Sequence, residues 1–244
     1  MGKLFKNLKP YWKSVLVIVV LLVVQAFCDL SLPQYTSDII DTGIQNSGVE
    51  HILPEKITAE EFQNAQLFMT ADEQKTWQDA YNGDGDLLDR NDFSKKDLEQ
   101  FDSDLIVPIL LNYQMSMMSE DGFRELLAQQ QQGNPQAAEQ MKTMSIADIG
   151  NSMGVTLTPF ERTEEDDDGN ETTVTCVDVR PLFAAMQEAG QFTEETRSEM
   201  RSQLKTMLDT MGESLVQSMG IAYAVQCAQA AAEREEQPTR MISG

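Results

Sequence analysis

Histidine, cysteine and basic side chains are scarce in this sequence, and each shortage excludes a class of site. The 244 residues include one histidine, His51, and three cysteines, Cys28, Cys176 and Cys227. A zinc centre or a histidine-based catalytic apparatus therefore has almost no ligands or bases from which to be built. Cys176 and Cys227 could pair in an oxidising compartment, and two unpaired thiols in the core fit their spacing equally well.

The charge is strongly one-sided, with 40 acidic residues against 18 basic ones and a formal net charge of −22. Such a surface repels nucleic acid and anionic lipid headgroups, so we predict no nucleic-acid partner. The sequence also lacks G-x-x-x-x-G-K-[ST], the glycine-rich loop that cradles nucleotide phosphates. We therefore predict that the chain holds no cofactor and, since no nucleophile–base pair stands out either, that it is not an enzyme.

The most apolar part of the chain lies near its N-terminus. Every residue from Val15 to Val24 is valine, leucine or isoleucine, and Tyr11–Leu32 as a whole is long enough to cross a bilayer as a helix. Tyr11 and Trp12 stand where interfacial aromatic residues are common, four lysines precede the span, and acidic residues follow it. The positive-inside rule then predicts a protein of the cell membrane with a cytoplasmic N-terminus and an extracytoplasmic bulk.

A cleavable signal peptide is the alternative interpretation of this segment. Val24 and Ala26 supply small residues at the −3 and −1 positions of a cut before Phe27. The stretch Asp29–Ile44 favours an uncleaved anchor, because its apolar spacing is typical of a helix that continues past the membrane with a kink near Pro33.

Residues 4–48 read LFKNLKPYWKSVLVIVVLLVVQAFCDLSLPQYTSDIIDTGIQNSG. This stretch resembles the start of an ATP-binding cassette (ABC) exporter half-transporter, a permease fused to an ATP-binding domain. In that family a short elbow helix on the inner leaflet precedes a long first transmembrane helix. The elbow would include Leu4, Phe5, Leu8, Pro10 and Tyr11, and the end-of-helix pattern would include Leu32, Pro33, Ile39, Ile40, Asp41, Gly43 and Ile44.

The resemblance implies three parts. Residues 1–44 would form the elbow and first transmembrane helix with its outward extension, residues 45–236 an acidic extracytoplasmic insertion, and residues 237–244 a short tail. Residues 211–235, MGESLVQSMGIAYAVQCAQAAAERE, resemble the helix that leads back to the second transmembrane helix of such a protein. The expected partners are the membrane and other transmembrane helices or a partner half-transporter.

The implied function is membrane transport, namely export, with this chain as the N-terminal part of a transmembrane subunit. The chain departs from the family because it carries neither the phosphate-binding loop nor the later transmembrane helices, so it has no ATPase activity of its own. The alternative is a free-standing, membrane-anchored module that binds an extracellular partner through its acidic surface. An extracellular enzyme is a third and less favoured hypothesis.

The extracytoplasmic part is predicted to be mainly helical with a small β-hairpin. Thr58, Thr70, Ser94 and Ser145 each precede an acidic residue by three positions, which is typical of a helix N-cap. The predicted helices are Glu60–Phe68, Asp72–Tyr81, Lys95–Phe101, Asp121–Gln132, Pro135–Met144 and Glu194–Met211, with buried or amphipathic helices in Leu105–Met118 and Ser214–Ala232. Gly154–Glu161 and Thr172–Val179 alternate as hairpin strands around an acidic turn, Glu164–Asn170.

The segment Asn82–Asp92 suggests a calcium loop, with Asp84, Asp86 and Asp89 as oxygen ligands. The EF-hand spacing fails, because the first and last ligand positions would be Ala80 and Asn91 rather than aspartate and glutamate. A plain acidic turn is the favoured interpretation, and we predict no metal site.

Overall fold

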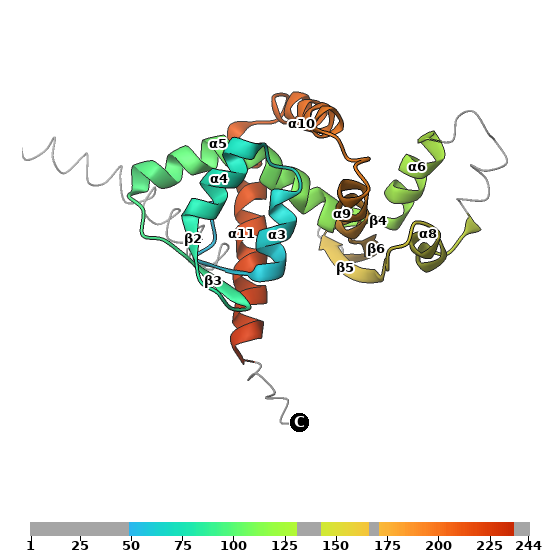
Figure 1. The fold of residues 1–244 in the computed structure, drawn as a ribbon, viewed down its shortest axis with the longest axis horizontal. Coiled ribbons are helices and arrows are strands. Elements are labelled where there is room, and N and C mark those ends of the chain that lie inside the picture. The colour runs from blue at the N-terminus through green and yellow to red at the C-terminus, as the bar shows by residue number, and fades with distance from the viewer. Residues whose placement is uncertain (1–48, 131–142, 166–170, 237–244) are drawn as a thin grey trace, which may run out of the picture. The chain divides into compact units, whose positions relative to one another are not determined.

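The computed structural model describes residues 49–130, 143–165 and 171–236. The chain divides into two compact units, Met1–Glu50 and His51–Gly244, and all of the elements below belong to the second unit. This unit is mainly helical, as the sequence predicts, and it has two small antiparallel sheets where the sequence predicts a single β-hairpin (Figure 1). None of the helices in the described ranges is long and apolar enough to cross a bilayer, and the predicted span Tyr11–Leu32 lies outside those ranges.

The elements follow one another along the chain without long described loops. The helices are α3 (Ala59–Gln66), α4 (Ala71–Ala80), α5 (Lys95–Ser116), α6 (Glu120–Gln130), α8 (Ile146–Ser152), α9 (Arg180–Glu188), α10 (Glu194–Leu208) and α11 (Glu213–Glu236). The strands are β1 (Lys56–Thr58), β2 (Tyr81–Asn82), β3 (Leu87–Arg90), β4 (Met118–Ser119), β5 (Pro159–Glu165) and β6 (Glu171–Val177). The predicted helix Pro135–Met144 falls mostly outside the described residues.

The predicted N-caps are confirmed. The hydroxyls of Thr58, Thr70, Ser94 and Ser145 each accept the backbone N–H three residues later, at the starts of α3, α4, α5 and α8. In α4 the Glu73 carboxylate also accepts the Thr70 N–H at 2.8 Å, which completes a reciprocal capping box. These side chains satisfy N–H groups that have no partner inside the helix, so they fix where the helices begin.

The first sheet corrects the expected acidic turn at Asn82–Asp92. Part of this segment forms the strands of a hairpin, with β3 between β1 and β2 in an antiparallel order β1-β3-β2. Leu88 is buried on one side of β3, and the side chain of its neighbour Asp89 is exposed, as strand alternation requires. Gly83 has φ of 129°, a left-handed conformation that only glycine adopts readily, so the turn depends on it.

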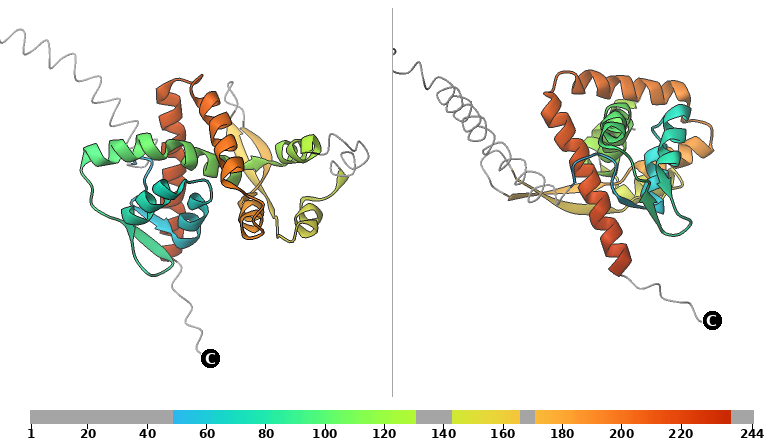
Figure 2. Two further views of the ribbon diagram at one scale, coloured as in Figure 1. Left: turned by 45° about the horizontal axis from the view of Figure 1, so that its top comes forward. Right: turned by 90° about the vertical axis from the view of Figure 1, so that its left-hand side faces the viewer.

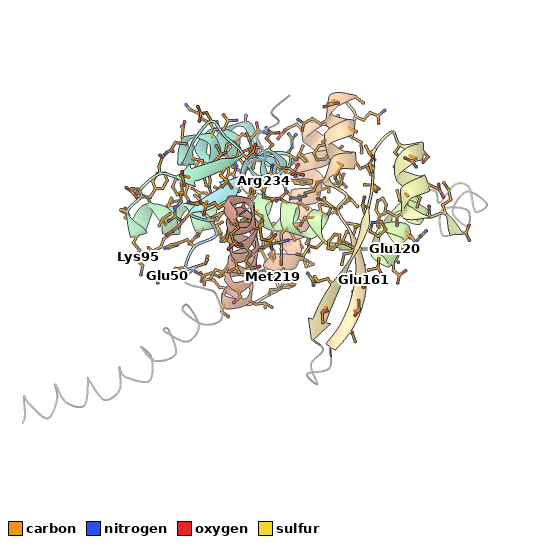
Figure 3. The ribbon with its side chains drawn as sticks, turned by 90° about the horizontal axis from the view of Figure 1, so that it is seen from below. Glu50, Lys95, Glu120, Glu161, Met219 and Arg234 are labelled. Atoms are coloured by element: carbon orange, nitrogen blue, oxygen red, sulfur yellow. The ribbon has the colours of Figure 1, made fainter. Side chains whose placement is uncertain are left out.

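The second sheet contains the predicted hairpin, but its first strand is displaced along the sequence. β5 begins at Pro159 rather than Gly154, because Gly154 lies in a turn after α8 with φ of 77°. β5 continues through Glu165, so Glu164 and Glu165 belong to the strand and not to the acidic turn; the rest of that turn is outside the described residues. The hairpin extends away from the helices (Figure 3).

Two hydrophobic clusters form the interior of this unit. The first core consists of Ile52, Leu53, Ile57, Ala65, Met69, Trp77, Ala80, Tyr81, Leu88, Leu105, Ile109, Tyr223 and Cys227. The second core consists of Leu67, Phe68, Leu110, Leu111, Met115, Phe123, Leu127, Ile146, Ile149, Leu157, Val177, Val179, Phe183, Phe192, Leu204 and Leu208. α5 contributes to both cores, because it is longer than predicted and joins the two predicted segments Lys95–Phe101 and Leu105–Met118.

α11 packs against α5 and alongside β1, as the views in Figures 1 and 2 agree. A Cβ atom at Gly220 would lie 2.6 Å from Ile52 Cγ2 and 2.7 Å from Ile106 Cδ1, so glycine permits this close approach. The Lys56 ammonium donates to the Glu235 carboxylate, and Arg234 donates to Asp86 at 3.0 Å. The first strand and the last turn of the described unit therefore lie side by side.

Candidate functional site: a methionine-lined cavity

A cavity of about 860 Å³ lies against the second core. It is bounded by the C-terminal half of α5, by α6 and by α9 and α10, which lie beside that half of α5 (Figures 1 and 2). This volume falls in the range of protein sites that hold small organic molecules.

The wall of the cavity is almost wholly apolar and unusually rich in methionine. Its described residues include no charged side chain, and its polar members are Gln114, Gln191, Thr196 and Gln203. Six of the 14 methionines in the chain contribute to it: Met115, Met118, Met153, Met186, Met200 and Met207. The other lining residues are Leu111, Phe123, Leu127, Val179, Leu182, Phe183, Ala185, Ala189 and Leu204. Methionine side chains are unbranched and flexible, so they can adapt to ligands of irregular shape. A wall rich in methionine is therefore suited to binding a molecule.

The amphipathic pattern of α10 explains why one face of it lines the cavity. Met200, Leu204 and Met207 recur at intervals of four and three residues, which places them on one stripe of a helix. Met207 is 39% exposed and Gln203 is exposed, whereas Leu204 is buried. The exposed end of this stripe therefore marks the mouth of the cavity, and the buried part marks its wall.

Two arginines hold α10 in place. Arg197 donates from Nε to the Leu67 carbonyl at 2.9 Å, and Arg201 donates to the Phe68 carbonyl at 2.9 Å. Arg201 also makes two bonds, of 2.5 and 2.6 Å, to the Glu73 carboxylate on α4. Charge-assisted, bidentate contacts of this kind are strong and directional. They anchor α10 to the segment between α3 and α4, so the helix is not free to collapse into the cavity.

A cluster of three phenylalanines adjoins the cavity, and one of them, Phe183, lines it. Phe68, Phe183 and Phe192 pack with ring centroids between 5.2 and 5.9 Å apart, in tilted and edge-to-face arrangements. The Arg197 guanidinium lies 5.2 Å from the Phe192 ring centroid. Such ring contacts stabilise the fold more than the burial of apolar surface alone, and they hold Phe183 in place at the cavity wall.

A buried ionic cluster lies between the two cores. Arg180, at the start of α9, donates from Nη1 to Glu61 at 2.6 Å and to Asn112 at 3.3 Å, and its Nε and Nη2 contact Asp178. Burial disfavours the charged guanidinium, but the hydrogen bonds and charges of Asp178 and Glu61 outweigh it and raise the pKa of Arg180. The Asn112 amide completes the cluster by donating to Glu61 at 2.7 Å. Each charged group has a partner within the cluster, so the cluster connects α3, α5 and α9.

The two described cysteines are buried and unpaired, which decides between the alternatives that their spacing left open. Burial, and next the nearby Glu61 charge, raise the pKa of Cys227 far above its ordinary value, so this thiol is not a nucleophile at neutral pH. The Tyr223 hydroxyl beside it makes no hydrogen bond to nitrogen or oxygen in the described part of the chain, and burial raises its pKa as well.

The acidic residues considered as calcium ligands lie far from the cavity, on the first sheet. Asp84, Asp86 and Asp89 are all exposed, and the Asp86 carboxylate is taken by Arg234, whose place near the first sheet is visible in Figure 3. Within the described ranges no three histidine, cysteine, aspartate or glutamate side chains are grouped closely enough to hold a metal. The single histidine contacts Asp102 at 2.7 Å from Nδ1, and Asp102 also accepts the Ile52 N–H, so this pair fastens the start of the unit to α5.

Sequence reasoning did not find the cavity, because its lining comes from segments spread between Leu111 and Met207. The one sequence pattern that pointed toward the cavity is the stripe of Met200, Leu204 and Met207 on α10. The same pattern is typical of a helix that packs on a closed core, so it does not predict a cavity. The sequence analysis also missed α9, the other main wall, because Val179 at its N-cap has no side chain that could cap the helix.

No protein family model, curated protein or solved structure matches this chain.

Proposed function

We propose that the unit beginning at His51 is a binding domain for an apolar small molecule, and that it serves an export system at the membrane. The methionine-lined cavity carries this proposal. A closed hydrophobic core would be filled by its own side chains, since protein interiors are packed as densely as organic crystals. An uncharged space of about 860 Å³, with Phe183 held in its wall and with adaptable thioethers, is suited to reversible binding of a hydrophobic molecule.

The part played in transport rests on the resemblance of residues 4–48 to the start of an ABC exporter. One further observation supports it. A domain inserted between two consecutive transmembrane helices must begin and end at neighbouring points, and Lys56 contacts Glu235. In this proposal the domain stands outside the membrane, on a chain with a cytoplasmic N-terminus, and presents or collects the transported molecule. ATP hydrolysis would belong to a nucleotide-binding domain that this chain does not contain.

A free-standing, membrane-anchored binding module would use the same cavity. The two candidates differ in what accompanies the chain: an exporter requires more apolar spans and a phosphate-binding loop in the same or a neighbouring reading frame. Sequencing the gene and its neighbourhood beyond the codon for Gly244 distinguishes them.

Binding itself can be tested on the full chain in lipid nanodiscs. With 13C-methyl methionine labelling, decanol should shift the signals of Met186 and Met200, which line the cavity. Met69 lies in the first core at 0% exposure and should not respond. Equal responses from Met69 and the cavity methionines would mean non-specific partition and would remove the proposal.

A matched pair of substitutions sharpens this test. Ala185 lines the cavity, and Ala185→Trp should occupy part of it and weaken the shifts. Ala222 is exposed on α11, and Ala222→Trp should leave them unchanged. Unaltered binding in Ala185→Trp would place the ligand elsewhere.

The membrane anchor has its own test. N-terminal sequencing of protein purified from membranes should begin at Met1 or Gly2. A sequence that begins at Phe27 would instead show a cleaved signal peptide.

A further inference from the structure

A polar groove adjoins the mouth of the methionine-lined cavity and has a volume of about 500 Å³. Its described lining residues are all polar, exposed and on α10: Glu195, Ser198, Glu199, Ser202, Gln203 and Thr206. Gln203 lines the cavity as well, and its amide donates to the Glu199 carboxylate at 3.5 Å. The groove and the cavity therefore meet at the side chain of Gln203.

The helical repeat explains how α10 borders both hollows. An α-helix turns by about 100° per residue, so side chains three and four positions apart lie on one side of it. The apolar stripe of α10 lines the cavity, and the polar stripe that contains Glu195 and Glu199 runs beside it. Glu199 stands one turn before Gln203, so its carboxylate lies next to the mouth.

The groove carries negative charge without a matching cation. Glu195 and Glu199 form no ion pair with a described residue. Arg197 and Arg201 of the same helix do not line the groove, because they reach the segment between α3 and α4. The three hydroxyl groups beside the carboxylates add neutral acceptors. A positively charged hydrogen-bond donor is therefore favoured in the groove, and an anion is repelled.

From this arrangement we infer that the site takes amphiphiles that carry an ammonium group at one end of an apolar chain. The chain lies among the methionines of the cavity, and the ammonium group lies at the mouth and donates to Glu195 and Glu199. A charged group at the mouth keeps part of its hydration, so it avoids the cost of burial in the uncharged cavity. This inference rests on the proposed function and adds the chemical class of the ligand and the residues that recognise its polar end.

The experiment compares three molecules that have the same number of carbons and different polar ends: decylamine, decanol and decanoate. Each is titrated at pH 7 against the full chain in phosphatidylcholine nanodiscs, and the methyl signals of Met186 and Met200 are the readout. Decylamine, protonated at this pH, should bind about fivefold more tightly than decanol, because exposed charge pairs contribute modestly. Decanoate should bind more weakly than decanol, because its charge has the same sign as the groove.

Substitutions assign the preference to the groove. Glu195→Gln/Glu199→Gln should bind decanol as the native chain does and should lose the preference for decylamine. Glu233→Gln/Glu236→Gln is the matched control, because it removes the same charge from exposed positions at the end of α11, away from α10 (Figures 1 and 2). This control should keep the preference. All variants are compared in identical nanodiscs, so partition into lipid is common to them, and decanol binding verifies the fold of each.

Ionic strength gives a second readout. The screening length falls from about 30 Å at 0.01 M salt to about 3 Å at 1 M salt. The advantage of decylamine over decanol should therefore shrink as salt is added. An advantage that salt leaves unchanged would not be electrostatic and would overturn the inference.

The outcomes separate this inference from the proposed function. If decanol shifts the cavity methionines but decylamine has no advantage, recognition of an ammonium group is wrong and the apolar site stands. If Glu195→Gln/Glu199→Gln keeps the advantage, or if the control loses it equally, the groove does not supply it. If none of the three molecules shifts the cavity methionines, the proposed function itself fails.

Discussion

The two cores of this unit differ in their side chains and in how densely these pack. In the first core, Trp77 stacks on Phe62 at 5.9 Å and packs at 5.0 Å from Tyr81, and its Nε1 donates to the Phe62 carbonyl at 3.1 Å. The Tyr81 hydroxyl donates to the Pro54 carbonyl at 3.0 Å. The second core borders a wall of flexible methionines around open space. The first core therefore has the character of a scaffold and the second that of a site.

A small domain can keep a cavity open when other parts of it are packed densely. Helices that line empty space lose packing contacts, and stability must come from elsewhere in the same cooperative unit. Here α10 is fixed by Arg197 and Arg201 to backbone carbonyls between α3 and α4, and α5 runs through both cores. The dense core and the ionic contacts supply the rigidity that the cavity wall lacks.

The largest contrast should come from truncating one side chain in each core. Trp77→Ala removes a fully buried ring and its hydrogen bond, and should lower the free energy of unfolding by about 3–5 kcal/mol. Met200→Ala enlarges a space that is already open and should cost about 1 kcal/mol or less. Urea unfolding followed by circular dichroism measures both. Equal losses would contradict the division into a scaffold and a site.

The ionic cluster between the cores comes next. Arg180→Met leaves the partly buried Glu61 and Asp178 without their cation, and should cost about 2–3 kcal/mol in the same urea assay. Arg234→Met breaks an exposed pair with Asp86 and serves as the control, with an expected loss below about 1 kcal/mol. A small loss at Arg180 would show that the two cores do not depend on this junction.

Because α11 approaches the first core closely at Gly220, a substitution there should lower stability by an intermediate amount. Gly220→Ala would press a methyl group onto Ile52 and Ile106, and should cost about 1–3 kcal/mol by overpacking. A Cβ atom at Gly85 would meet no other atom within 4 Å, so Gly85→Ala should change stability by less than about 0.5 kcal/mol. Thermal melting compares the two, and a harmless Gly220→Ala would mean that α11 is loosely held.

The anchor of α10 should show itself in the pH dependence of stability. Burial opposes the charge of Glu73, but the bonds from Arg201 and Thr70 outweigh burial and lower the pKa of this carboxyl. Its stabilising contribution is therefore present above the unfolded-state pKa, about 4.3, and is lost as the pH falls through the lower folded-state pKa. Glu73→Gln should cost about 1 kcal/mol at pH 7 and progressively less below about pH 4. A pH-independent difference would show that the charge of Glu73 is not what holds α10.

The smallest expected effect is on the reactivity of the two described thiols, Cys176 in β6 and Cys227 in α11. Cys176 is 2% exposed and Cys227 is 4% exposed. In a Cys28→Ser background, neither should react with a maleimide at neutral pH, and both should react in urea, as mass spectrometry can count. Rapid labelling of Cys227 in the folded protein would mean that the first core opens more readily than its packing indicates.

Local rules predicted much of the fold, because helix starts depend on neighbouring residues. Thr58, Thr70, Ser94 and Ser145 were identified from a hydroxyl and an acid three positions apart, and a cap needs nothing more distant. β3 was missed for the opposite reason. Its aspartate-rich surroundings suggest a turn, whereas Leu87–Arg90 becomes the central strand of the sheet by pairing with distant β1 as well as with nearby β2.

The site was beyond sequence reasoning for a related physical cause. Arg180 pairs with Glu61 across more than half of the described chain, and nothing near either residue signals the partner. Cavities exist between elements, so their lining can be read only once tertiary packing is known.

The late position of α11 in the chain has a consequence for how the protein is made. Synthesis proceeds from the N-terminus, yet the first core needs Tyr223 and Cys227, and Ile52 rests against Gly220. β1, α3 and α4 must therefore wait, exposed, until almost the whole domain has emerged, and a chain threaded across a membrane would cross it before this core can close. Nascent chains arrested before Glu213 should accordingly be cleaved by a protease near Trp77, and chains arrested after Glu236 should resist it.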